Sequence, residues 1–148
     1  MDLLLTIATL GPLGYIPFSG TVASIASFLV LYPIRIFSFS WYIVIFVVIV
    51  IFGCRAISYA LDFFKHRDPS IIVWDEVIGS ACSLLFIPLG YKQFLVTMIL
   101  FRIFDGSKIL GISYIERMPG TWGVVLDDVL AGIYAGSTVL FLCSFGLL

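Results

Sequence analysis

The sequence has 148 residues, of which 61% are hydrophobic and 11% are charged, and its formal net charge is −1. Its mean hydropathy is +1.17. A soluble domain usually contains about 45–50% apolar and about 25% charged residues, so the composition excludes an ordinary soluble domain. It also lacks the basic surface that a nucleic-acid partner requires. We therefore expect an all-α integral membrane protein with a single membrane-embedded domain over residues 1–148.

The cysteines and the N-terminus add two smaller expectations. Cys54, Cys82 and Cys143 lie apart in apolar segments and form no CxxC pair, which indicates packed hydrophobic side chains rather than a disulfide framework. The chain begins Met-Asp-Leu-Leu-Leu without a basic region, so we expect no cleaved signal peptide there.

The first half of the chain alternates apolar segments with short breaks. Residues 3–10 are apolar and predict a short helix, and glycines and prolines then interrupt any helix over 11–21. The segment 21–34 predicts a first membrane span. A second span is predicted over 41–61, because Trp41 and Tyr42 open the most apolar run and aromatic residues are common at membrane interfaces.

The second half predicts three more apolar segments. These are residues 74–87, 91–104 and 124–146, separated by a Pro88–Gly90 turn and a polar loop over 106–123. Segments of about 14 residues rise only about 21 Å as helices, against a hydrocarbon core of about 30 Å. The sequence therefore predicts a compact bundle of about five short transmembrane helices, in which the third and fourth segments either cross the membrane or form a re-entrant hairpin.

The charges predict an orientation. In a five-span arrangement six of the eight basic residues lie on the side of the N-terminus, and only Arg35 and Lys92 lie opposite. Basic loops face the cytoplasm, so we expect this side to be cytoplasmic. All nine acidic residues fall on the same side. A four- or six-span arrangement would divide the acids between the two faces, which favours five spans.

Five carboxylates from three segments are predicted to meet at this face. They are Asp75, Glu76, Asp105, Asp127 and Asp128. At a low-dielectric boundary they repel one another, and a divalent cation removes that conflict. Oxygen ligands suit Mg²⁺, whereas zinc is disfavoured because the chain has one histidine, His66, in a polar loop.

Each pair of adjacent acids is expected to divide its roles. Neighbouring residues on a helix point about 100° apart, so one member of each pair faces the site more directly than the other. The alternative is that Asp75 and Asp127 are helix N-caps or first-turn acids that interact with the helix dipole.

Candidate phosphate-binding groups accompany the acids. Arg102, Asp105 and Lys108 are spaced i, i+3, i+6 and share one helical stripe. Arg102 can bind a phosphate through two hydrogen bonds and Lys108 as a point charge, the alternative being side chains that reach the interface from a helix end. Ser19, Gly20 and Thr21 precede a helix, where free N–H groups favour an anion. A second pattern, Gly132-x-x-x-Gly136 with Gly79 and Ser83, indicates close helix packing instead.

Together these blocks resemble the phosphatidylglycerophosphatase A family of small bacterial inner-membrane lipid phosphatases. The blocks are residues 17–24, residues 72–79, and residues 101–108 continued by 123–132. The chain departs from the family pattern at Ser19, where the family usually has proline, at Ala23, where it usually has glycine, and after Lys108, where Pro-x-Pro is common. These departures concern loop geometry rather than the charged set.

The resemblance implies Mg²⁺-dependent hydrolysis of phosphatidylglycerophosphate to phosphatidylglycerol and phosphate at the cytoplasmic face of the membrane. We expect some of the five acids to hold Mg²⁺, and Asp75, Asp105 and Asp128 to be the catalytic carboxylates. Arg102 and Lys108 would neutralise the phosphoryl oxygens, and Asp128 would act as the base toward water. An aspartyl-phosphate intermediate is the mechanistic alternative.

Other functions fit the sequence less well. A non-enzymatic ion-binding or transporter-like component would place acids at mid-membrane depth, whereas here they are at one end of the segments. A CDP-alcohol phosphotransferase requires Ala-Arg after an Asp-Gly, which Asp105-Gly106 lacks. Histidine-dependent lipid phosphatases need histidines that this chain does not have.

Overall fold

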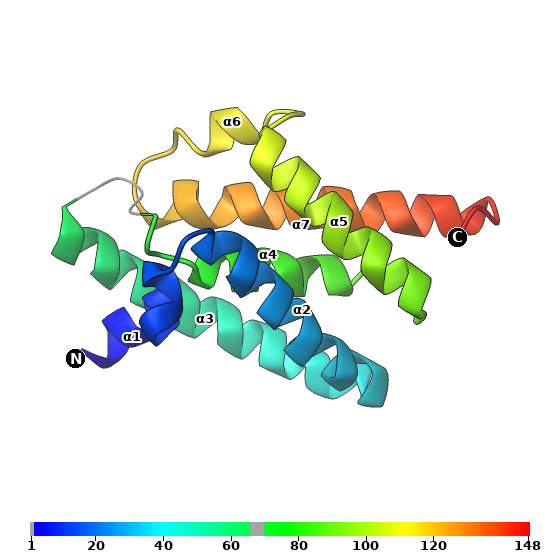
Figure 1. The fold of residues 1–148 in the computed structure, drawn as a ribbon, viewed down its shortest axis with the longest axis horizontal. Helices are drawn as coiled ribbons and strands as arrows, with labels where there is room; N and C mark the ends of the chain where they lie inside the picture. The colour runs from blue at the N-terminus through cyan, green and yellow to red at the C-terminus, as the bar shows by residue number, and fades with distance from the viewer. Residues whose placement is uncertain (1, 66–69) are drawn as a thin grey trace.

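The computed structural model describes residues 2–65 and 70–148, and within these residues every regular element is helical (Figure 1). The all-α prediction is therefore confirmed for the part of the chain that is described. The elements in chain order are α1 (Leu3–Thr9), the 3₁₀ helix η1 (Gly11–Tyr15), α2 (Ser19–Phe37), α3 (Phe39–Phe64), α4 (Trp74–Leu84), α5 (Tyr91–Ser107), α6 (Ile112–Ile115) and α7 (Thr121–Ser144).

Three of these helices, α2, α3 and α7, are long and apolar enough to cross a membrane. The other two predicted segments are shorter helices. α4 has 11 residues and α5 has 17, which corresponds to about 16 Å and about 25 Å of helix. Several boundaries differ from the prediction. α2 begins at Ser19 and continues through Pro33 to Phe37, α4 ends at Leu84 rather than Ile87, and α7 begins at Thr121.

Tertiary hydrogen bonds explain how α4 can end early. The Tyr42 hydroxyl donates to the Ala81 carbonyl at 2.6 Å, and Arg35 Nε donates to the Leu84 carbonyl at 3.3 Å. The Tyr32 hydroxyl bonds the backbone of Gly90. Polar backbone at membrane depth must find such partners. Since Tyr32 and Arg35 belong to the last turns of α2, the turn between α4 and α5 lies near the end of α2 that is farther from Ser19.

Small residues allow α4 and α7 to pack closely. A Cβ added to Gly136 would lie 2.7 Å from the Ser83 carbonyl oxygen, and one added to Gly79 would lie 2.6 Å from the Asp128 carbonyl oxygen. A Cβ on Gly132 would overlap the Gly79 carbonyl. The predicted role of the Gly132–Gly136 pattern in helix packing is therefore confirmed, together with that of Gly79 and Ser83.

Aromatic packing fixes α2 against α5. The Phe28 ring meets the Phe101 ring edge to face at a centroid distance of 5.9 Å, and the Phe94 ring at 6.0 Å. Phe28 and Phe101 are both fully buried. Because Ser24 is one turn before Phe28 and Arg102 follows Phe101, this contact places Ser24 next to Arg102.

Candidate active site

Three carboxylates from three helices converge in the interior. Glu76 of α4, Asp105 of α5 and Asp128 of α7 each offer one oxygen, and these oxygens lie within 4.8 Å of one another. The three residues are 9%, 7% and 3% exposed. Such a group fits a divalent cation, because like charges at this separation otherwise repel strongly. We call Glu76, Asp105 and Asp128 the carboxylate trio.

The packing of α4 on α7 brings two members of the trio together. Glu76 is one turn before Gly79, and Asp128 is one turn before Gly132. Because the backbones touch at these glycines, the side chains one turn earlier also approach each other. Asp105 joins them from α5, one turn after the fully buried Phe101.

Arg102 lies against the trio and neutralises part of its charge. Its Nη1 atom is 2.7 Å from Glu76 Oε2 and 2.9 Å from Asp105 Oδ2. Ser24 completes the group, because its hydroxyl donates to Glu76 Oε2 at 2.6 Å and accepts from Arg102 at 3.1 Å. Ser24 was not among the predicted site residues. Ser24 lies in the same sequence block as Ser19–Thr21, one helical turn after Gly20, and this spacing could have indicated that it belongs to the site.

Lys108 links two further carboxylates. Its Nζ atom is 3.0 Å from Asp105 Oδ1 and 2.6 Å from Asp127 Oδ2. Burial lowers the pKa of Lys108, but the hydrogen bond and charge of Asp127 and the charge of Asp105 outweigh it and raise the pKa above its usual range. Lys108 therefore stays protonated at neutral pH. The stripe of Arg102, Asp105 and Lys108 predicted from their spacing is present.

The structure separates the members of each acidic pair. Glu76 and Asp128 enter the trio, whereas Asp127 pairs with Lys108 and Asp75 accepts a hydrogen bond from the Glu76 backbone N–H at 3.0 Å. Asp75 is in the first turn of α4, as the alternative for it predicted. The same alternative is wrong for Asp127, because α7 begins at Thr121 and places Asp127 in its second turn.

The residues of the predicted phosphate loop, Ser19, Gly20 and Thr21, do not precede the helix but form the first turn of α2, and they line a cavity beside this cluster. The cavity has a volume of about 620 Å³, and Ser19, Gly20, Thr21 and Arg102 all line it. We call it the headgroup cavity. A Cβ on Gly20 would overlap Glu76 Oε1, so a larger residue here would displace the Glu76 carboxylate. The headgroup cavity thus brings the start of α2 and the guanidinium of Arg102 to one place, next to the acids.

The sequence profile of the phosphatidylglycerophosphatase A family matches residues 6–143. The chain belongs to the phosphatidylglycerophosphatase A family. The match includes every residue of the trio, both cations and the Ser19–Thr21 loop. No solved structure gives a significant match to the chain.

Curated relatives match over part of their length. A Bacteroides thetaiotaomicron protein named "Putative phosphatidylinositol-3-phosphatase" is 43% identical over 72 residues, 47% of this chain and 45% of the relative. The phosphatidylglycerophosphatase A of Haemophilus influenzae is 42% identical over 71 residues, 47% of the chain and 44% of the relative. The phosphatidylglycerophosphatase A of Escherichia coli is 32% identical over 78 residues, which are 51% of this chain and 45% of the relative. The chain thus aligns with a little under half of each of these relatives.

The structure describes the local contacts at two positions where the chain departs from the phosphatidylglycerophosphatase A pattern. Ser19, at the usual proline position, donates its hydroxyl to the Ser70 carbonyl at 3.1 Å, and Ser70 also lines the headgroup cavity. After Lys108 the chain turns into α6, where Ile112 is fully buried. His66 lies outside the described residues.

Proposed function

We propose that this chain hydrolyses the phosphomonoester of phosphatidylglycerophosphate to phosphatidylglycerol and phosphate, with Mg²⁺ as cofactor. One observation carries the proposal. Three buried carboxylates, two cations and the start of α2 come together from four separate parts of the sequence. The fold has no other evident reason to bury so many charges in an apolar bundle.

The donor set fits a magnesium ion. The trio supplies three oxygens, and Asp75 and Asp127 bring the local carboxylates to five against the two cations Arg102 and Lys108. This excess of negative charge suits a hard divalent cation, which prefers carboxylate and water ligands. Glu76, Asp105 and Asp128 would hold it, with Asp75 and Asp127 close by. When bound, Mg²⁺ would supply charge stabilisation and a more acidic water.

The remaining steps belong to the side chains of this chain. Arg102 lines the headgroup cavity and already binds carboxylate oxygens, and a guanidinium binds phosphate oxygens through the same kind of charge-assisted hydrogen bond. We propose that Arg102 and Lys108 bind the phosphoryl oxygens, and that the N–H groups of Ser19, Gly20 and Thr21 bind the phosphate from the other side.

Asp128 is proposed as the base that accepts the proton of the attacking water. It is the most buried of the trio, and among the described residues it forms no ion pair. The trio needs only one oxygen of Asp128 as a metal ligand, so its second oxygen would remain to accept the proton. In the alternative mechanism an aspartate attacks phosphorus and becomes phosphorylated, and trapping a phosphoaspartate at low pH would establish it.

Two relatives are named for phosphatidylglycerophosphate and one for phosphatidylinositol 3-phosphate. The chemistry common to these names is a phosphomonoester on a phospholipid headgroup. We propose phosphatidylglycerophosphate because the family profile covers nearly the whole chain.

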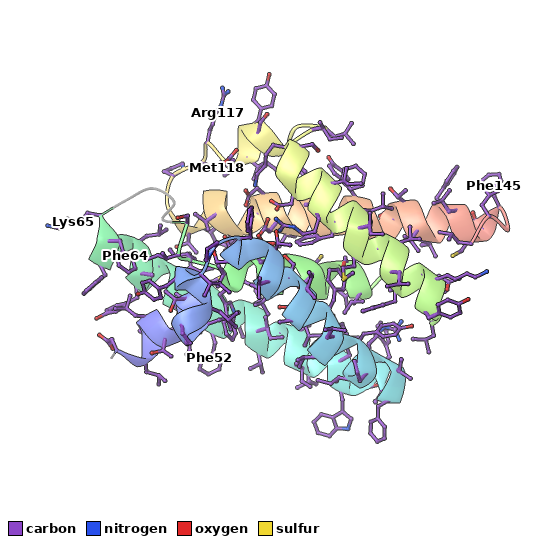
Figure 2. The ribbon with its side chains drawn as sticks, in the orientation of Figure 1. Phe52, Phe64, Lys65, Arg117, Met118 and Phe145 are labelled. Carbon is purple, nitrogen blue, oxygen red and sulfur yellow. The ribbon has the colours of Figure 1, made fainter. Side chains whose placement is uncertain are left out.

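We also propose that the site faces the cytoplasm from the bacterial inner membrane. Figure 2 shows Lys65 and Arg117 on the side where α3 ends and α6 lies, and Phe145 at the opposite end of α7. The trio is at the former end. The predominance of basic residues there supports a cytoplasmic location.

A non-enzymatic ion-binding protein is the rival. It requires a polar path through the bilayer. In the described helices the trio lies at one end, at the third residue of α4, the eighth of α7 and the third from last of α5. The remainder of these helices offers no comparable carboxylate cluster among the described residues.

The deciding experiment measures phosphate release by the purified protein from phosphatidylglycerophosphate, with Mg²⁺ and with a chelator. We expect release that depends on Mg²⁺ and exceeds the rate on phosphatidylinositol 3-phosphate. A Glu116→Gln variant, which alters an exposed acid outside the site, is the charge control. Absence of release from folded protein would contradict the proposal.

A further inference from the structure

A second cavity lies between η1, α2, α3 and α4, apart from the carboxylate trio. Its volume is about 270 Å³, and its lining is almost entirely apolar, including Leu13, Val30 and Ile49. The hydroxyl of Ser27, which also lines it, donates to the Ala23 carbonyl at 2.7 Å. The cavity therefore offers an apolar ligand a surface without a free charged group. We call it the apolar groove.

The apolar groove lies farther along α2 than the headgroup cavity, on the same stripe of the helix. Ser19 lines the headgroup cavity, and Ala26 and Val30 line the groove. These positions are spaced i, i+7 and i+11, so they lie on one stripe of the helix. The rise from Ser19 to Ala26 is about 10 Å. η1 lies between the two cavities, with Tyr15 on one and Leu13 on the other.

The floor of the apolar groove is fixed. The Trp74 ring lines it, and the indole N–H of Trp74 donates to the Ile49 carbonyl at 3.2 Å. A Cβ on Gly53 would overlap this ring, so Trp74 packs directly against the backbone of α3. A floor held in this way gives a preformed cavity, the usual condition for a ligand site.

We propose that the apolar groove binds an acyl chain of the phospholipid substrate while its phosphate occupies the headgroup cavity. The assignment rests on the proposed function and adds a substrate-binding site to it. α2 and α3 are candidate membrane spans, and Val30 at the groove is 63% exposed. We place this face in the hydrocarbon of the bilayer. The rise of about 10 Å from Ser19 at one cavity to Ala26 at the other suits a molecule with a polar head and an apolar tail.

The test compares two neighbouring residues of α2. Val30→Phe places a larger side chain in the apolar groove, and Ala26→Leu narrows it at a deeper point. Leu29→Phe is the matched control, because Leu29 is 60% exposed at the same depth but does not line the groove. Each variant is assayed on phosphatidylglycerophosphate with long acyl chains and on its dibutyryl analogue, whose chains are too short to enter.

We expect Val30→Phe and Ala26→Leu to lower kcat/KM on the long-chain substrate about tenfold, the effect of leaving two methylene groups unburied. The rate on the dibutyryl analogue should be unchanged, which also reports that the variants are folded. Leu29→Phe should change neither rate. Equal losses on both substrates, or equal behaviour of Val30→Phe and Leu29→Phe, would overturn the proposal.

A binding measurement separates this inference from the proposed function. If the wild-type protein hydrolyses neither substrate, the proposed function fails, but the groove can still be tested with phosphatidylglycerol that carries a photoreactive acyl chain. In lipid nanodiscs we expect adducts on residues 10–13 and 26–31 that Val30→Phe reduces and Leu29→Phe does not. Adducts spread evenly over α2 and α3 would overturn the proposal. The absence of adducts, as expected when a second copy of the chain covers the groove, would also overturn it.

Discussion

At the scale of single residues, Asp128 differs from the other acids of the site. Arg102 or Lys108 pairs with Glu76, Asp105 and Asp127, whereas Asp128 has no ion pair among the described residues. We expect Asp128→Asn to lower kcat at least about 100-fold, because it removes the proposed base and a metal ligand. The neutral amide also relieves repulsion within the trio, so the folded protein should still be extracted and should unfold at a similar temperature.

The control for Asp128→Asn is its neighbour. Asp127→Asn removes the carboxylate that binds Lys108 at 2.6 Å, and it should destabilise the protein more and slow the reaction less than Asp128→Asn. Asp75→Asn should also abolish turnover if Asp75 is catalytic. Near-native rates in both Asp128→Asn and Asp75→Asn, measured as phosphate release, would show that the site has been assigned to the wrong acids.

Gly20 provides a second prediction at this scale. A Cβ there would overlap Glu76 Oε1, the mobile end of a side chain rather than backbone, so Gly20→Ala should fold but displace the Glu76 carboxylate. We expect the Mg²⁺ concentration for half-maximal activity to rise about 10-fold, within the range for disturbed metal ligands. The measurement is a Mg²⁺ titration of phosphate release.

Gly106→Ala is the matched control for Gly20→Ala. Gly106 is also helical and its added Cβ would meet nothing within 4 Å, so alanine should be neutral or slightly stabilising through its helix propensity. If Gly20→Ala and Gly106→Ala gave the same Mg²⁺ dependence, the close approach of α2 to Glu76 would have no part in metal binding.

At the scale of helices, the contact between α4 and α7 positions the trio. Gly132→Leu would force its side chain against the Gly79 backbone, which cannot move aside without shifting α4. We expect a loss of about 1–3 kcal/mol or more in the free energy of unfolding, typical of overpacking, together with lost activity. Ser137→Ala on the exposed face of α7 is the control. Thermal unfolding in detergent would show the difference, and equal stability of the two variants would contradict it.

The sequence predicted the helices better than it predicted their ends. Apolar runs located all five main helices, because apolar length is a local property. The end of α4 at Leu84 was missed, since it depends on hydrogen bonds from Tyr42 and Arg35, which are far away in the sequence. The start of α7 at Thr121 was also missed. The helix begins with Thr-Trp-Gly, which precedes the apolar run from which the segment was predicted.

At the scale of the whole molecule, the sequence predicted which face carries the acids but not which acids meet. Counting charges along alternating spans placed all of them at one end. Choosing Glu76 over Asp75 requires the rotation of α4 about its axis, which contacts at Gly79 and Phe101 determine. The i, i+3 spacing within α5 predicted that Arg102 lies beside Asp105. The hydrogen bond from Arg102 to Ser24 of α2 could be found only in the tertiary structure.

The orientation of the molecule in the membrane yields the last prediction. In a variant whose native Cys54, Cys82 and Cys143 are replaced by alanine, a single cysteine is introduced either at Ser40, in the first turn of α3, or at Glu116, after α6. These positions lie at opposite ends of the bundle, and the greater number of basic residues at the Glu116 end favours the cytoplasm. A membrane-impermeant maleimide added to intact spheroplasts should therefore label Ser40→Cys and leave Glu116→Cys unlabelled until the cells are lysed. Labelling of Glu116→Cys alone would place the carboxylate trio on the outer face, where a phosphatase of newly made phospholipid would require its substrate to cross the membrane first.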